Sequence, residues 1–263
     1  MLVEPGTKVS LKKYDPDDTG PYKDEAAAKD KLRKQIDDLV RLQNLLYADG
    51  RYAVLVVLQG MDTSGKDGTI RHVMSGLSPQ GVAVHAFKAP NDEERAHDFL
   101  WRVHKAVPPL SYMGIFNRSH YEDVLVVRVD GLAPKNVWKA RYEQINQFEK
   151  SLVKNNLVIL KFFLHISKDE QKRRLEQRLQ DPQRHWKFSI KDIEERQYWP
   201  AYRKAYEAAL SRCSTRWAPW HIVPANHKWY RNLYVAEMLV QALRDLNLRY
   251  PQPNIDVSKI VIP

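Results

Sequence analysis

Apolar and polar positions along this chain predict strands and helices that follow one another. Two bounded apolar runs rich in branched and aromatic residues, 53–58 and 157–166, predict buried strands of a parallel sheet. Shorter apolar stretches predict further strands at 82–87, 111–116 and 220–224. Apolar residues at three- and four-residue spacing predict helices at 24–48, 69–75, 92–106, 138–155, 167–180, 190–213 and 227–248. Residues 124–129 fit either a strand or a helix.

Residues that cap, end or kink helices refine these boundaries. Asp24 and Ser167 precede helical segments and are expected to cap them. Gly50 is expected to end the first helix. Pro200 is expected to kink the helix at 190–213.

Strands that alternate with helices predict a parallel sheet with helices on both faces, a three-layer α/β/α fold. Ligands of such sheets bind where the strands end, so loops 60–66 and 117–123 should share one edge. We expect one domain over 23–249. An irregular arm at 1–22, outside the core, would precede it, and a tail at 250–263 would follow.

A phosphate-binding loop is the clearest functional motif. Residues 60–66 read G-x-x-x-x-G-K between the strand at 53–58 and a helix, which is the context that this motif requires. The glycines let backbone N–H groups point inward, the helix adds its positive end, and Lys66 adds a mobile charge. A glycine-rich turn without a ligand is the alternative. The candidate phosphate-binding residues are Gly60, Met61, Thr63, Ser64, Gly65, Asp67 and Gly68.

Two positions depart from the usual metal-binding pattern of such loops. Asp67 replaces the Ser or Thr whose hydroxyl normally holds Mg²⁺, and Asn117 replaces the carboxylate that usually ends a neighbouring strand. Asp62 and Asp67 are alternative metal ligands, and we favour Asp62, either for Mg²⁺ or for orienting the attacking oxygen. Glu122 is a second candidate, directly or through water. Arg118 is placed to clamp a phosphate bidentately.

The segment 168–204 is rich in charge, with eleven Lys or Arg against seven Asp or Glu. A solvated helix face is one interpretation. The other is a mobile lid whose arginines neutralise a transferring phosphoryl group and exclude water. Within that hypothesis Arg178 is the preferred lid arginine.

Composition narrows the class of partner. The chain has 263 residues and a formal net charge of +10, which favours a polyanion such as nucleic acid, an anionic membrane or a phosphate-rich substrate. Cys213 is the single cysteine, which excludes an intrachain disulfide. We expect a cytoplasmic protein, because the sequence shows neither a secretory signal nor an apolar run of membrane-spanning length.

Several segments together resemble the polyphosphate kinase 2 family: 60–70, 116–129, 157–179 and 185–196. The resemblance implies a P-loop kinase fold like that of thymidylate kinase, with a helical lid. It also implies reversible phosphoryl transfer between inorganic polyphosphate and nucleotides with Mg²⁺ or Mn²⁺. Asp62, Lys66, Arg118 and Arg178 match the family's catalytic positions. Asn117 departs from the Asp of much of the family and resembles the subgroup that accepts both AMP and ADP.

The expected function is therefore a polyphosphate-dependent nucleotide kinase that converts AMP to ADP and ADP to ATP. Asn117 and Glu122 would bind the nucleotide, and Lys187, Arg203 and Lys204 the polyphosphate. Adenine nucleotides are the expected substrates, with guanine nucleotides as further candidates, in a homodimer or homotetramer that binds neither nucleic acid nor membrane. The alternatives are an ATP-dependent nucleoside monophosphate kinase and a basic nucleic-acid-binding P-loop module.

Overall fold

The computed structural model describes residues 1–188, 190–255, 260 and 262, without the side chains of residues 184, 187 and 191. Within them one sheet has the strand order β1-β6-β5-β2-β4-β3. Every neighbouring pair is parallel except β1 with β6. The strands are β1 (Leu2–Val3), β2 (Ala53–Gln59), β3 (Val82–Ala86), β4 (Met113–Asn117), β5 (Leu157–His165) and β6 (Trp220–Pro224).

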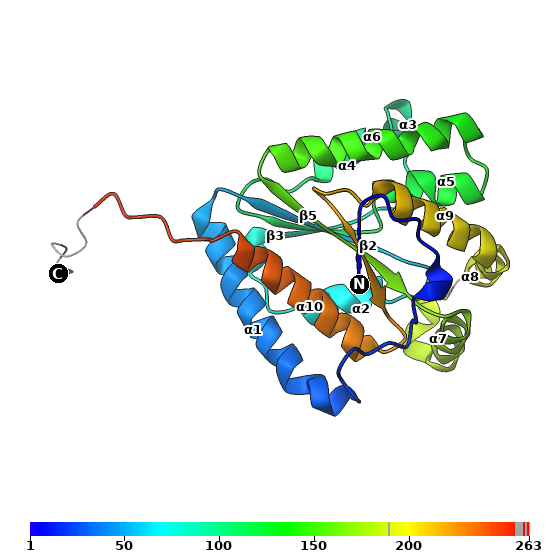
Figure 1. Cartoon of the computed structure of the whole chain (residues 1–263), viewed down its shortest axis with the longest axis horizontal. Coiled ribbons are helices and arrows are strands. Elements are labelled where there is room, and N and C mark those ends of the chain that lie inside the picture. The colour runs from blue at the N-terminus through cyan, green and yellow to red at the C-terminus, as the bar shows by residue number, and fades with distance from the viewer. Residues whose placement is uncertain (189, 256–259, 261, 263) are drawn as a thin grey trace.

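Helices cover both faces of this sheet, so the expected three-layer α/β/α architecture is confirmed (Figure 1). One layer contains α1 (Glu25–Asp49), α2 (Lys66–Val73) and α10 (Lys228–Asp245). The opposite layer contains α4 (Trp101–Ala106), α5 (Val126–Val129), α6 (Lys135–Lys154) and α9 (Trp199–Cys213), with α3 (Asp92–Ala96) beside them. Helices α7 (Lys168–Gln180) and α8 (Ile190–Glu195) lie beyond the carboxyl end of β5.

The central strand β2 places the phosphate loop between two neighbouring strand ends. All seven of its residues are buried. Leu58 lies opposite Asn117 of β4 and Phe162 of β5. The loop after β2 therefore opens at the same sheet edge as the segment after β4, as expected from the topology.

The capping predictions for three positions are confirmed. The side chain of Asp24 accepts a hydrogen bond from the backbone N–H of Ala27 at the start of α1. Gly50 ends that helix in the left-handed conformation, with φ of 76°. The Ser167 side chain accepts from the N–H of Glu170 at the start of α7.

The expectation that the N-terminal arm lies outside the core is wrong. β1 pairs with β6, and Val3, Val9 and Leu11 are buried in the hydrophobic core. Side chains of α9 hold the arm, because Ser211 and Glu207 accept hydrogen bonds from the backbone N–H groups of Val9 and Leu11. The apolar residues of the arm stand in runs too short to predict an element, with Pro5, Gly6 and polar residues between Val3 and Val9, so no local pattern marks them.

Two helices expected to be continuous are broken. The segment 92–106 forms α3 and α4, because His97 is extended and Asp98 caps the N–H of Leu100 at 2.9 Å to begin a new turn. The segment 190–213 forms α8, a 3₁₀ turn and α9. Pro200 stands in the first turn of α9 instead of kinking a helix, at a position where its missing N–H costs no hydrogen bond.

The ambiguous segment 124–129 is helical. A 3₁₀ helix covers His120–Val124 and α5 follows it. No helix among the described residues is long and apolar enough to cross a membrane.

Candidate active site

The phosphate loop bends tightly between β2 and α2. Gly65 precedes α2 with φ of +102°, a conformation that residues with a Cβ rarely adopt. A Cβ at this position would clash with the guanidinium of Arg231. Glycine is therefore required here both by conformation and by space.

Lys66 arches back over the loop as the first residue of α2. Its Nζ donates to the carbonyl oxygen of Gly60 at 2.9 Å and lies 3.4 Å from that of Met61. Burial, followed by the nearby charge of Arg118, lowers the pKa of Lys66 to about 8. The charged form is thus costly in the absence of an anion, and a bound polyphosphate would stabilise it.

Three buried polar atoms of the loop, all within the described residues, have no hydrogen-bond partner: Asp62 Oδ2, Thr63 Oγ1 and Ser64 Oγ. Buried side-chain polar atoms are normally satisfied. Their clustering in one loop indicates a place for a polar ligand or cation.

Arg118 and Glu122 face the loop from the end of β4. Arg118 has φ of +62°, and its backbone N–H donates to Leu58 O at 3.1 Å, which holds the turn against β2. Its Nη1 lies 3.5 Å from Glu122 Oε2. Both residues line one cavity with Gly60 and Asp62. The structure therefore brings together four of the residues singled out from the sequence.

The two departures from the usual motif lie in contact. Asn117 Nδ2 donates to Asp67 Oδ1 at 2.7 Å. An aspartate at position 117 would set two carboxylates at this distance, which raises the pKa of one of them. The amide of Asn117 instead leaves the carboxylate of Asp67 at the first turn of α2, where the helix dipole favours it.

The donor set fits Mg²⁺. The described residues contain no group of three or more His, Cys, Asp or Glu that could hold a metal alone. Mg²⁺ is usually bound by one or two carboxylates together with substrate phosphates and water. Asp62, with its unpartnered oxygen, and Glu122 on the same cavity supply that number of carboxylates.

The residues predicted for the lid and for polyphosphate binding lie in different surroundings: one in an ion pair, one in a cavity and one on the surface. Arg178 Nη1 donates to Asp192 Oδ2 at 3.0 Å, which joins α7 to α8. Arg203 lines a neighbouring cavity, and its buried Nε has no hydrogen-bond partner among the described residues. Lys204 is exposed on α9, and the side chain of Lys187 lies outside the described part of the chain.

Sequence reasoning missed three residues that contact the backbone of the loop. Gln171 and Arg174 reach it from α7, and Arg231 reaches it from α10. Gln171 and Arg174 are three residues apart, so a polar stripe on one face of α7 was the available signal. No local pattern marks Arg231.

The phosphate loop follows the central strand of a parallel sheet and ends with Lys66, and Arg118 and two carboxylates line the cavity beside it. This arrangement defines the class of P-loop phosphotransferases. The family model described as polyphosphate kinase 2 (PPK2) matches residues 22–251. The chain belongs to the polyphosphate kinase 2 family.

Individual relatives agree with this assignment. The chain is 51% identical over 261 residues to an AMP/ADP-polyphosphate phosphotransferase of Meiothermus ruber, covering 99% of this chain and 98% of the relative. It is 44% identical to an ADP-polyphosphate phosphotransferase of Rhodopseudomonas palustris, covering 95% and 91%. The crystal structure of polyphosphate kinase 2 from Arthrobacter aurescens matches with a TM-score of 0.93 at 44% identity, covering 98% of this chain and 95% of that one.

Proposed function

We propose that this protein transfers phosphoryl groups reversibly between inorganic polyphosphate and adenine nucleotides, converting AMP to ADP and ADP to ATP. The main support is the near-complete match to a relative named for both AMP and ADP. The relative from Rhodopseudomonas palustris is named for ADP alone and is less similar. The cavity at the phosphate loop supplies groups suited to this chemistry.

Within this proposal, charge neutralisation is the task of Lys66 and Arg118. Phosphoryl transfer spreads negative charge over the equatorial oxygens, and preorganised cations stabilise it. Lys66 is held over the loop by the carbonyl of Gly60. The contact of Arg118 with Glu122 is long, at 3.5 Å, so little is lost when its guanidinium turns to a phosphate.

Asp62 and Glu122 would hold Mg²⁺ or Mn²⁺. Asn117 would contact the phosphates of the nucleotide, and Glu122 would bind the nucleotide through the metal ion or water. When bound, the divalent ion neutralises charge on the phosphate oxygens. The attacking nucleotide oxygen displaces the polyphosphate chain in line. No covalent enzyme intermediate is required, so positioning and electrostatics suffice.

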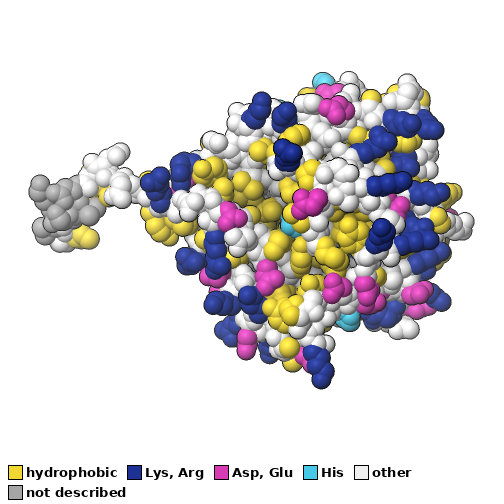
Figure 2. Space-filling model, viewed as in Figure 1, with side chains coloured by type: hydrophobic (Ala, Val, Ile, Leu, Met, Phe, Trp, Pro, Cys, Tyr) yellow, Lys and Arg dark blue, Asp and Glu magenta, His cyan; other side chains and the backbone are white. Residues whose placement is uncertain are grey.

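The polyphosphate chain would follow a second cavity beside the loop. Lys and Arg side chains gather on the face formed by α7, α8 and α9 (Figure 2). Met61 of the loop lines both cavities, and the second cavity also contains Lys12, Lys168 and Arg203. The unpartnered Nε of Arg203 is available to a phosphate oxygen. The proposed polyphosphate contacts are Lys187, Arg203 and Lys204.

The segment 168–204 would act as a lid of the single domain at 23–249. Arg178 would turn from Asp192 to the transferring phosphoryl group when substrates bind, so that its guanidinium stays paired with an anion. Guanine nucleotides are further proposed substrates. We propose a homodimer or homotetramer working in the cytoplasm, where the free thiol of Cys213 stays reduced.

The test is to incubate AMP or ADP with polyphosphate and Mg²⁺, without ATP, and to measure ADP and ATP. Product formation is expected, and Lys66→Ala should lower kcat by orders of magnitude. If only ATP serves as phosphoryl donor, the protein is a nucleoside monophosphate kinase and the proposal fails. If no donor gives product while nucleic acid binds in a salt-sensitive manner, the binding-module alternative applies.

A further inference from the structure

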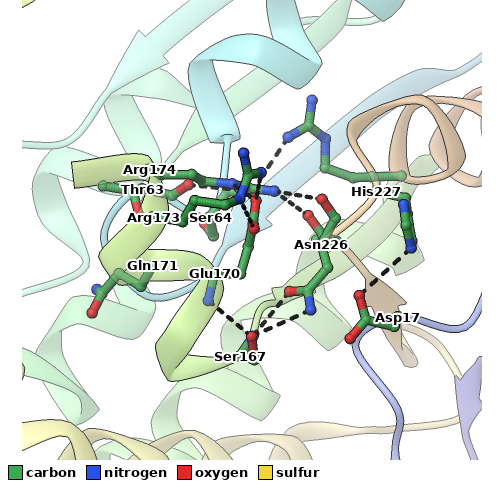
Figure 3. Close-up of polar contacts among 12 residues, drawn as sticks. Asp17, Thr63, Ser64, Ser167, Glu170, Gln171, Arg173, Arg174, Asn226 and His227 are labelled. Carbon is green, nitrogen blue, oxygen red and sulfur yellow. Dashed lines mark hydrogen bonds and ion pairs between the residues drawn. The ribbon is translucent and has the colours of Figure 1, made fainter. Parts of the chain in front are cut away.

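Three consecutive carbonyl groups of the phosphate loop are held from outside by side chains of two helices. Gln171 Nε2 donates to Asp62 O at 3.1 Å. Arg174 Nη1 donates to the carbonyls of Thr63 at 2.9 Å and Ser64 at 3.1 Å. Arg231 of α10 reaches the same Ser64 carbonyl at 3.4 Å. Figure 3 shows Arg174 lying between the loop and Asn226, above Glu170.

These contacts determine where the loop's N–H groups point. In a trans peptide the C=O of one residue and the N–H of the next point in opposite directions. Holding the carbonyls of residues 62 to 64 outward therefore turns the N–H groups of residues 63 to 65 toward the other side, where that of Ser64 donates to the carbonyl of Met61 at 3.1 Å and those of Thr63 and Gly65 face inward. Oriented N–H groups of this kind are the donors with which such a loop binds a phosphate.

Arg174 and Arg231 are also buried charges, although a neutral donor side chain could hold the same carbonyl groups. Arg174 is 8% exposed and Arg231 is 2% exposed. Arg174 pairs with Glu170 at 2.6 Å. Arg231 donates to neutral acceptors, the side chain of Asn232 at 2.8 Å and the Ser64 carbonyl. Burial and the neighbouring Arg174 lower the pKa of Arg231 to about 9. Buried positive charge is costly, and it becomes favourable when a polyanion binds across the loop.

A further contact extends this arrangement toward the proposed lid. Arg196 Nη1 donates to Gln171 Oε1 at 2.8 Å, while the other end of the same amide holds the carbonyl of Asp62. Arg196 follows Glu195, which lines the cavity at the loop. One amide side chain therefore joins the segment after α8 to the phosphate loop.

We propose that Gln171, Arg174 and Arg231 are positioning residues that hold the phosphate loop's peptides in the orientation needed for phosphoryl transfer. Arg196 links that orientation to the segment between α8 and α9 through Gln171. This inference rests on the proposed phosphotransfer activity. It adds residues that act through the loop backbone to those that face the cavity.

Arg173 offers a matched control. It is adjacent to Arg174 and pairs with the same Glu170, with both of its hydrogen bonds at 2.6 Å. Its side chain is 52% exposed, and the contacts found for it are with Glu170. Arg173→Ala therefore removes one ion pair of Glu170 and leaves the carbonyl contacts of the loop in place.

The experiment compares wild type with Arg174→Lys, Gln171→Met and Arg173→Ala. Initial rates give kcat and KM for polyphosphate and AMP, calorimetry gives the affinity for tripolyphosphate, and thermal unfolding reports folding. Lysine keeps the charge of Arg174, but its single ammonium cannot replace three guanidinium nitrogens that hold Glu170, the two loop carbonyls and the carbonyls of Ala225 and Asn226 together. Methionine keeps the length of Gln171 without its donor. We expect kcat to fall about ten- to a hundredfold in both variants, while Arg173→Ala stays within about twofold of wild type.

A purely structural role would lower the unfolding temperature without lowering kcat of the folded enzyme. A folded Gln171→Met with wild-type kcat and wild-type tripolyphosphate affinity would overturn the proposal, even if Arg174→Lys fails to fold. An inactive wild-type protein would instead refute the proposed function. The two failures are therefore distinguishable.

Discussion

Lys161 lies in the middle of β5 with no exposed surface, and its charge is neutralised by one carboxylate. Its Nζ donates to Glu149 Oε2 at 2.6 Å, to the hydroxyl of Tyr121 at 2.8 Å and to the carbonyl of Cys213 at 2.7 Å. Burial opposes ionisation of Glu149, but Lys161 and His120 outweigh it and hold the pKa of Glu149 below its usual value. We therefore predict that Glu149→Gln destabilises the protein strongly.

The magnitude follows from leaving a buried charge unpaired. Removing one partner of a buried ion pair costs about 3–5 kcal/mol. With about 2.1 cal/mol/K of unfolding entropy per residue, a chain of 263 residues loses about 2 °C of Tm per kcal/mol. The Tm of Glu149→Gln should therefore fall by about 5–9 °C in differential scanning calorimetry.

The double variant Glu149→Gln/Lys161→Met tests the reasoning, because it leaves no unpaired charge. Its loss of stability should be smaller than the sum of the two single losses by at least about 1 kcal/mol. Because the pKa of Glu149 is lowered, the pair's contribution is present above the usual carboxyl pKa and is lost as pH falls through the folded-state pKa. Strictly additive single losses would refute the coupling and with it this account of Lys161.

Further predictions concern three residues of the loop and its neighbours, Lys66, Gly65 and Asn117. Because the pKa of Lys66 is lowered to about 8, KM for polyphosphate should rise above that pH, by up to about tenfold per unit, in initial-rate assays. The unfolded chain binds more protons between that value and the ordinary pKa of 10.5, so the free energy of unfolding should rise with pH there in urea titrations. Gly65→Ala should clash with Arg231 and lower stability by about 1–3 kcal/mol, with loss of kcat, by urea unfolding and rate assays. Asn117→Asp, which faces Asp67 with a second carboxylate, should lower Tm more at pH 8 than at pH 5, and MgCl₂ should recover part of the loss.

Each of these has a control on the same chain. Lys66→Arg keeps its charge at high pH, so a KM that still rises would contradict the assignment. Gly131 has φ of +68° with nothing near its Cβ position, so Gly131→Ala measures the conformational cost alone. An equal loss in the two glycine variants would remove the argument from Arg231. Asn117→Ala deletes the hydrogen bond without adding charge and should show no pH dependence of this kind.

Local patterns in the sequence were sufficient for strands β2 to β6, most helices and the phosphate loop, but not for β1. The run at 53–58 became β2, and the motif from Gly60 to Lys66 followed it as expected. These features depend on side-chain period and on short-range geometry, which a few neighbouring residues determine. Because β2 and β4 are parallel neighbours, the facing of Arg118 and Glu122 toward the loop also followed from topology rules.

Only the tertiary structure decided which distant side chains complete the site. Arg174 lies 110 residues from Ser64, whose carbonyl it holds, and Arg231 lies 167 residues away. The N-terminal arm enters the core through contacts with α9, about 200 residues further along the chain. In one of these contacts, Val9 and Ser211 are 202 residues apart. Such pairs are set by the order of strands and the packing of helices. No periodicity within a segment encodes a partner in another, so the sequence determined the loop and the fold determined what holds it.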